Sequence, residues 1–262
     1  MIREVWTFRD LLWELSKRDF VLRYRGSYAG FLWSLAHPVS MLAVYSLAFG
    51  IMLGRQGALS IEGAVAYSLA LFPGLALFQA LAETLNKAPF LISGNPAYVK
   101  KIVFPLALMP LVTVIVALAH TAISLVIWTI VYTCFHGRVP WGVVFLPFLL
   151  LLFTPVLLAV SLLFSALGVY LRDLGHFTGP AGQALLFLSP IFYSIDGFPP
   201  VLHSLFLLNP LTTLVEQTRA VLEQGRVTDW NGLAIYLLVA MMFAWGGWRV
   251  FKRLRDDFAD LL

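Results

Sequence analysis

The chain has 262 residues, of which 60% are apolar and only 12% are charged. Soluble domains carry about twice that share of charge. This composition excludes a soluble globular enzyme, a disordered tail and a nucleic-acid reader. The net charge is +4, and the basic residues flank apolar stretches, which indicates a membrane surface. The single cysteine, Cys134, can form neither an internal disulfide nor a multi-cysteine zinc site.

The first 25 residues are charged and mixed, and they predict an amphipathic helix over 3–22 that lies in the cytoplasmic interface. Apolar residues recur on one face at spacings of three and four: Val5, Phe8, Leu12 and Leu15. The opposite face carries charges of both signs. A plain membrane anchor and a docking surface for a cytoplasmic partner both fit this pattern, and the mixed signs favour protein contact. No apolar run lies near the start, so we expect no cleaved signal peptide.

Seven stretches lack Asp, Glu, Lys and Arg and are candidates for membrane spans. They are 26–54, 63–82, 102–137, 139–171, 174–195, 197–215 and 230–248. The sixth contains Pro199, Pro200 and the turn signal Asn209-Pro210, which interrupt a helix. We therefore expect 197–215 to form two short helices that enter the membrane and return on one side.

The distribution of positive charge favours six spans over seven. With six spans, 14 Lys and Arg residues lie on the side of both termini and 4 lie on the other side. Positive residues concentrate in cytoplasmic segments, so both termini are predicted to be cytoplasmic. A seventh span would place four C-terminal basic residues outside. The predicted fold is an all-α membrane protein with six transmembrane helices.

Polar residues inside the apolar stretches are few. Gln79 and Glu83 lie four apart near the end of the second span, and Glu83 and Lys87 have the spacing of a favourable ion pair. An intramembrane carboxylate is a functional-site hypothesis. At this shallow depth a structural ion pair is an equally good interpretation.

We interpret His120, in the middle of the third span, as a packing residue rather than a proton relay. No acidic residue lies at mid-membrane, where a proton- or sodium-coupled carrier usually needs one.

Aromatic residues inside the spans are candidates for a channel lining, because an aromatic face stacks on a sugar ring. Packing and lipid-facing positions are the alternative for most of them. The candidates are Tyr45, Phe49, Phe78, Trp128, Tyr132, Phe192 and Tyr193.

The chain contains no GxxxxGK[ST] phosphate-binding loop, so we expect it not to hydrolyse ATP. The segment Gly94–Lys101 lacks the second glycine and the hydroxyl residue of that motif. The loop 88–105 is longer than a minimal connection and is bounded by prolines. It is either a short helix parallel to the membrane that contacts a partner chain or a basic loop that follows the positive-inside rule.

Several motifs occur in a fixed order along the chain. They are Arg18-Asp19, Arg23-Tyr24, Gly30-Phe31-Leu32-Trp33-Ser34-Leu35, His37-Pro38, Asn95-Pro96, Tyr170-Leu171-Arg172-Asp173 and Asn209-Pro210. In this order the chain resembles the membrane subunit of type-2 ABC exporters. It is most similar to the permeases that export polysaccharides such as O-antigen, capsule and teichoic acid.

The resemblance implies a homodimer of one transmembrane domain, 1–262, in the cytoplasmic membrane, paired with two copies of an ATP-binding cassette subunit. That partner would bind ATP and Mg²⁺, and this chain would hold no cofactor or metal. The implied parts are a cytoplasmic interface helix (3–25), a coupling loop (88–102) and an external re-entrant gate (196–222). The implied coupling residues are Trp13, Lys17, Arg18, Asn95, Pro96, Tyr98, Lys100 and Lys101. The implied gate residues are Asp196, Pro199, Pro200, His203, Asn209 and Pro210.

The expected function is ATP-driven export of a lipid-linked polysaccharide, most simply O-antigen. Teichoic acid, capsule, or a smaller lipid or drug are alternative cargoes. An intramembrane glycosyl- or acyltransferase is a further alternative, and Asp196 and His203 would be its candidate residues. The motifs of common hydrolases and metalloenzymes are missing from the sequence, and no catalytic residue is expected.

Overall fold

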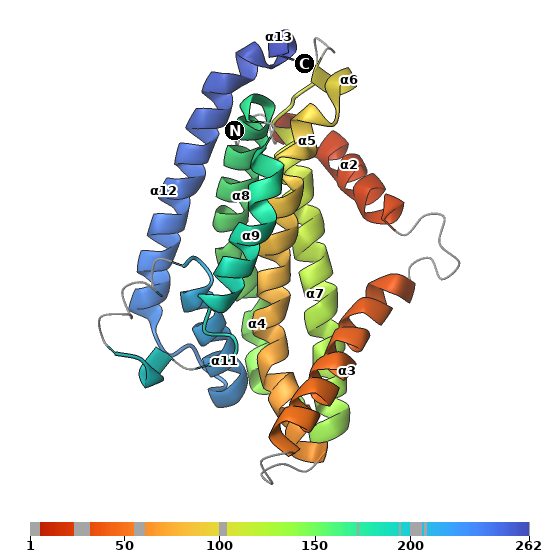
Figure 1. Ribbon diagram of the computed structural model, residues 1–262, viewed down its shortest axis with the longest axis vertical. Helices are drawn as coiled ribbons and strands as arrows, with labels where there is room; N and C mark the ends of the chain where they lie inside the picture. The colour runs from red at the N-terminus through yellow and green to blue at the C-terminus, as the bar shows by residue number, and fades with distance from the viewer. Residues whose placement is uncertain are drawn as a thin grey trace.

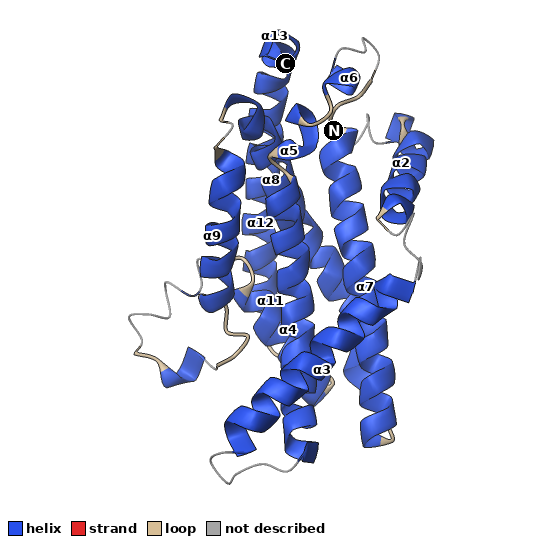
Figure 2. Ribbon diagram, turned by 45° about the vertical axis from the view of Figure 1, so that its right-hand side comes forward, coloured by secondary structure: helices blue, strands red, loops and turns tan. Residues whose placement is uncertain are grey.

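A computed structural model describes residues 6–23, 32–54, 61–99, 104–171, 173–193, 195–199, 206 and 209–261. Within these ranges the regular structure is entirely helical (Figure 2). Some predicted site residues lie outside the described residues: Lys100, Lys101, Pro200 and His203 completely, and Phe49 and Asp196 in their side chains.

Four long helices form the main bundle of the molecule and run along its longest axis, with the fourth of them at one side (Figure 1). They are α4 (Ile61–Lys87), α7 (Leu108–His136), α8 (Leu146–Tyr170) and α12 (Trp230–Leu254). Each belongs to a helical segment that is long and apolar enough to cross a membrane. The two shortest, α8 and α12, have 25 residues each and therefore extend over roughly 38 Å, which exceeds a hydrocarbon core of about 30 Å. The prediction of a multi-pass helical protein is confirmed at this level.

Two further apolar helices flank this centre. Helix α3 (Leu32–Gly54) packs on α4 and α7, and α9 (Leu174–Phe187) packs on α4 and α8. With 14 residues, α9 extends over only about 21 Å. The six-span topology therefore stays a prediction for these two helices.

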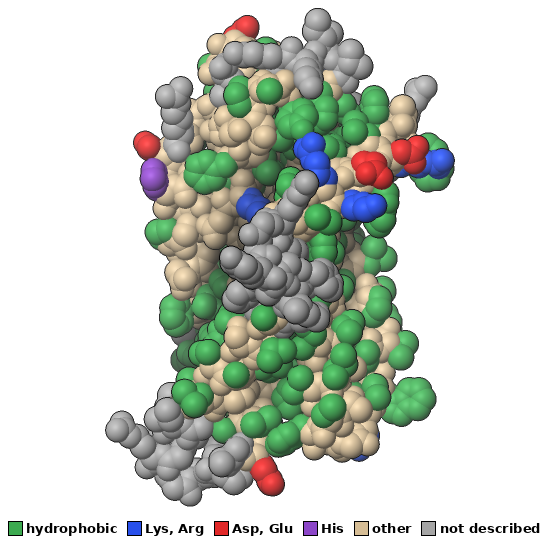
Figure 3. Space-filling view, turned by 90° about the vertical axis from the view of Figure 1, so that its right-hand side faces the viewer, with side chains coloured by type: hydrophobic (Ala, Val, Ile, Leu, Met, Phe, Trp, Pro, Cys, Tyr) green, Lys and Arg blue, Asp and Glu red, His purple; other side chains and the backbone are tan. Residues whose placement is uncertain are grey.

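The elements at the two ends of the bundle differ in character. Helix α2 (Arg9–Leu22), the short helices α5 (Phe90–Ser93) and α6 (Pro96–Val99), and the C-terminal α13 (Phe258–Leu261) lie at one end (Figure 1). Helix α11 (Thr212–Gln224) lies near the other end and packs on the 3-10 helix η1 (Trp141–Phe145). On the face that carries α2, charged side chains gather in a band near the first end, and the surface below is largely apolar (Figure 3).

The segment 197–215 contains no continuous helix in its described part. The 3-10 helix η2 (Ile195–Gly197) ends before Pro199, and α11 begins only at Thr212. The interruption predicted from Pro199 and Asn209-Pro210 is thus present. Entry of this segment into the membrane stays a prediction.

A close contact between backbones fixes α5 against α8. A Cβ atom added at Gly168 of α8 would meet the backbone of Pro89, the residue that precedes α5. Only glycine leaves room for this approach. The start of the loop that follows α4 is therefore held against α8.

Candidate functional site

Helix α2 docks on α7 through the apolar face that the sequence predicts. Leu12 is 9% exposed and packs with Leu108, Val112 and Val116 of α7. Trp13, on another face of α2, is 66% exposed. The amphipathic helix is thus confirmed over the described part of 3–22, and its outer face is open to a partner or to lipid headgroups.

A network of charges joins α2, α4 and α7 at the same end. The carboxylate of Glu83 is 8% exposed and lies 2.7 Å from Nη1 of Arg23 and 3.0 Å from Nζ of Lys87. His120 Nδ1 lies 3.6 Å from the second carboxylate oxygen and 2.9 Å from the same Arg23 nitrogen. Lys87 also lies 3.9 Å from Asp19. The predicted Glu83–Lys87 pair is confirmed as one part of this larger network.

The network has a structural consequence for the surface helix. Arg23 directly follows α2, Glu83 and Lys87 belong to α4, and His120 belongs to α7. The ring of Phe20 on α2 also stacks on His120, with centroids 4.9 Å apart. Because the carboxylate is shielded from water, these contacts are less screened than a surface ion pair. A displacement of α2 therefore acts on two long helices.

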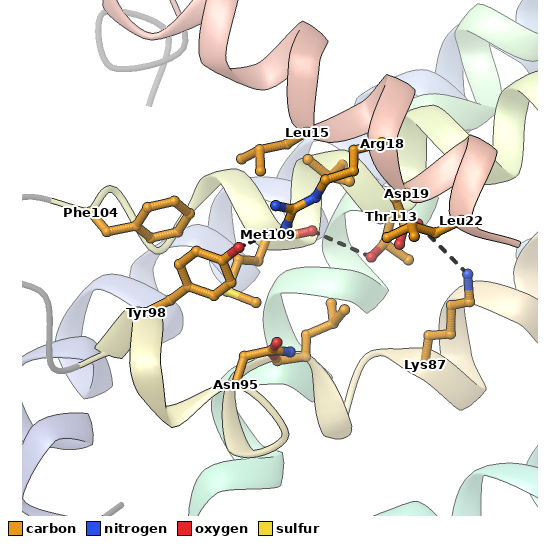
Figure 4. Close-up of a pocket in the computed structure, with 12 residues that line it drawn as sticks. Leu15, Arg18, Asp19, Leu22, Lys87, Asn95, Tyr98, Phe104, Met109 and Thr113 are labelled. Carbon is orange, nitrogen blue, oxygen red and sulfur yellow. Dashed lines mark hydrogen bonds and ion pairs between the residues drawn. The ribbon is translucent and has the colours of Figure 1, made fainter. Parts of the chain in front are cut away.

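A cavity of about 170 Å³ opens between α2, the α5–α6 segment and the start of α7 (Figure 4). Arg18 donates a hydrogen bond of 2.7 Å to the hydroxyl of Tyr98 across this cavity. The Tyr98 ring packs on Phe104 at 4.5 Å between centroids. Asn95 also lines the cavity and donates to the carbonyl of Leu91 at 3.0 Å. The structure thus brings the predicted residues Arg18, Asn95 and Tyr98 together.

The remaining described coupling residues lie on outer surfaces near this cavity. Trp13 and Lys17 are exposed on α2, and Pro96 is exposed at the start of α6. These residues and the cavity face the same end of the molecule. Their contact with an ATP-binding subunit stays a prediction.

The predicted channel aromatics occupy two separate places. Trp128 is 2% exposed, and its indole N–H donates to the carbonyl of Leu69 at 2.7 Å. Phe78 is 9% exposed, and the ring of Tyr132 lies 5.1 Å from that of Trp128 in a tilted arrangement. Tyr45 is partly buried against the core. Trp128 and Phe78 therefore pack inside the subunit, and Tyr45 and Tyr132 are partly buried against its core.

Phe192 and Tyr193 lie elsewhere, just after α9. Phe192 offers its backbone carbonyl to the hydroxyl of Tyr67 at 3.2 Å. The ring of Tyr193 lies 5.7 Å from that of Phe206. The role of these aromatics in a channel stays a prediction.

Asn209 ties the segment before α11 to the end of α9. Its amide nitrogen donates to the carbonyl of Leu185 at 3.1 Å and to the hydroxyl of Ser189 at 2.8 Å. Its side-chain oxygen accepts from the backbone N–H of Leu211 at 3.0 Å. The side chain is buried and its hydrogen bonds are short, so the predicted turn at Asn209-Pro210 is a well-anchored one.

Arg219 is a structural residue that the sequence reasoning missed. Its guanidinium donates to the carbonyls of Pro190 and Ile191 at 3.0 and 2.9 Å. Both carbonyls follow α9, so α11 holds the exit of that helix. The available signal was that Arg219 is one of the four basic residues assigned to the less positive side.

A bundle of long apolar helices with an amphipathic helix docked at one end defines a multi-pass membrane protein. Residues 10–222 match the family described as ABC-2 type transporter, and the chain belongs to this family. It is a multi-pass protein of the inner membrane.

Relatives are similar over almost the whole length. The O-antigen export system permease protein RfbA of Myxococcus xanthus is 26% identical over 262 residues, covering 99% of this chain and 98% of the relative. A protein of the same name from Klebsiella pneumoniae is 26% identical over 258 residues, covering 97% and 95%.

Proposed function

We propose that this chain is the membrane-spanning subunit of an ATP-driven exporter that carries a lipid-linked polysaccharide, most simply O-antigen, across the cytoplasmic membrane. The observation that carries the proposal is the similarity to O-antigen export permeases over 97% or more of this chain. The similarity includes both ends of the bundle, so it covers the elements needed for coupling and for release as well as the spans.

The proposed topology adds α3 and α9 to the four long helices, which gives six spans. The end that carries α2, α5, α6 and α13 is then cytoplasmic. The charged band at this end supports the assignment, because positive residues concentrate on the cytoplasmic side. The segment 196–222 lies at the external end and acts as the gate.

In the proposed mechanism two copies of the chain enclose a channel at their shared interface. ATP and Mg²⁺ are bound by two copies of a separate ATP-binding cassette subunit. That subunit contacts the outer face of α2 and the loop 88–102. The Arg18–Tyr98 hydrogen bond joins these two parts, and the network around Glu83 joins α2 to α4 and α7. Motion of the ATP-binding subunits thereby reaches the spans.

The first test is purification of the tagged chain in mild detergent, followed by mass spectrometry of the proteins that remain bound. We expect an ATP-binding subunit in equal amount, and a second, unrelated multi-pass protein with the same tag serves as the control. Recovery of the chain alone as a stable species would contradict the proposal.

Once the complex has been purified, replacement of both Lys100 and Lys101 by Glu should separate ATP hydrolysis from export. Unchanged export would remove the loop from the coupling path.

A further inference from the structure

A second and larger cavity, of about 400 Å³, lies between α4 and α9 below the charged network. Its polar lining comes from two helices and the end of α2. Besides Arg23, Glu83 and Lys87 of the network, three carboxamides line it: Gln79, Asn86 and Gln183. None of the residues predicted for coupling, channel or gate except Phe78 belongs to this lining.

The three carboxamides have no partner in the described part of the chain. Gln79, Asn86 and Gln183 are exposed, and their side chains form no hydrogen bond with a described residue. A carboxamide carries two donors and an acceptor with two lone pairs. Three such groups around one cavity therefore offer a set of unused hydrogen-bonding sites.

The depth of the carboxamides makes a lipid-facing position costly. Gln79 precedes Lys87 by two turns of α4, a rise of about 12 Å into the apolar part of the helix. Gln183 lies at a similar depth, nine residues after the start of α9 at Leu174, a rise of about 14 Å. A polar group that faces hydrocarbon without a partner is strongly unfavourable. This surface therefore faces a polar environment.

The shape and charge of the cavity favour a hydroxyl-rich ligand over a packed helix of a second copy. On the α9 side, a Cβ atom added at Gly179 or Gly182 would meet nothing within 4 Å, so no side chain fills the cavity at this wall. Arg23 and Lys87 are each 41% exposed and already contact Glu83. Covering both cations with an apolar helix would desolvate them without new partners. The groups without a partner among the described residues are the three carboxamides, whose neutral donors and acceptors match sugar hydroxyls.

We propose that this cavity is a sugar-binding subsite at the cytoplasmic mouth of the exporter, where Gln79, Asn86 and Gln183 bind hydroxyl groups of the glycan before it enters the channel. The subsite rests on the proposed function, because it takes the exported glycan as its ligand. Carboxamides that bind hydroxyls in either orientation suit a ligand that must slide past them.

Binding can be tested independently of export by protection of a single cysteine. Replacing Cys134, the sole cysteine, by Ser gives a background for Gln183→Cys. Inside-out membrane vesicles are prepared from cells that make the lipid-linked glycan and from cells in which its synthesis is stopped. A membrane-impermeant maleimide should label Cys at 183 several-fold more slowly when the glycan is present. Lys252→Cys, exposed near the same end on α12, should react equally in both preparations.

Two results of this labelling experiment would overturn the subsite. Equal labelling at position 183 with and without glycan would show that no glycan occupies the cavity. No labelling in either preparation would show that the face is covered, as it would be by a second copy of the chain.

Export by variant chains separates failure of the subsite from failure of the proposed function. The gene is deleted and replaced by wild type, by Q79L/Q183L, or by the control Q224L at the opposite end on α11. Glycan on the surface of intact cells is followed with a labelled antibody, and chain levels are matched by immunoblot. We expect the double variant to export roughly tenfold more slowly, equivalent to about 1.4 kcal/mol. Normal export by Q79L/Q183L would reject the subsite alone, whereas surface glycan that persists in the deletion strain would reject the proposed function.

Discussion

Substitution of Glu83 by Gln tests whether the buried charge holds α2 on the bundle. The change keeps the size of the side chain and its acceptor oxygen but removes the negative charge. Arg23 and Lys87, which lie 2.7 and 3.0 Å from the carboxylate, then face a neutral group. We expect α2 to be bound less firmly and the folded chain to be less stable.

The size of the effect follows from the exposure of the partners. Truncating one member of a fully buried ion pair costs about 3–5 kcal/mol, and an exposed pair contributes about 0.2–1 kcal/mol. Glu83 is 8% exposed, whereas Arg23 and Lys87 are each 41% exposed. An intermediate loss of about 2 kcal/mol is therefore expected. For a chain of this size that corresponds to a fall in Tm of roughly 4–8 °C.

The assay is thermal unfolding of the purified chain in one detergent at one heating rate, because unfolding of such proteins is often irreversible. Arg23→Gln and the double variant complete a cycle that isolates the coupling between the two side chains. Asp10→Asn is the control, since its pair with Arg9 spans 3.7 Å with side chains 97% and 61% exposed. A fall in Tm for Glu83→Gln no larger than that for Asp10→Asn, or additive effects of Glu83→Gln and Arg23→Gln, would refute the reasoning.

Three further changes test other contacts. Gly168→Ala drives a Cβ into the backbone before α5 and should cost about 1–3 kcal/mol in the same thermal assay, whereas Gly179→Ala, which enters open space, should not. Asn209→Ala removes three hydrogen bonds of a buried side chain and should lower the free energy of unfolding by about 2–3 kcal/mol. A change within ~0.5 kcal/mol would show that other contacts hold this turn. Tyr98→Phe removes the hydroxyl that accepts the hydrogen bond from Arg18 of α2. The Tm should stay within about 3 °C of the parent value, while ATP hydrolysis by the purified complex should fall. Unchanged hydrolysis would exclude this hydroxyl from coupling.

The sequence predicted features that depend on local spacing and on hydropathy. The apolar face of α2, the Glu83–Lys87 pair and the interruption at Asn209-Pro210 follow from residues within a few positions of each other. The long spans follow from unbroken apolar stretches. These properties are set by the helical repeat and by the cost of charge in lipid, so neighbouring residues suffice to reveal them.

Features that join distant segments were outside the reach of such reasoning. Arg23 and His120 approach Glu83 from positions 60 and 37 residues away. In a membrane-spanning helix the side that faces the protein and the side that faces lipid are equally hydrophobic. The sequence therefore could not show that Trp128 is buried while other aromatic side chains are exposed. The unpartnered carboxamide of Gln183 was missed for the same reason, because only the packing of α9 on α4 places it beside Gln79.

The charged network and the carboxamide cavity share three side chains: Arg23, Glu83 and Lys87. Whatever moves α2 must therefore change the rim of the cavity as well as the attachment of α2 to α4 and α7. These three side chains therefore connect the surface proposed for the ATP-binding subunit with the subsite proposed for the glycan. Glu83→Gln should accordingly raise the maleimide labelling of Cys at 183 in vesicles that contain glycan. Labelling that remains as strongly protected as in the parent would show that the network and the cavity act separately.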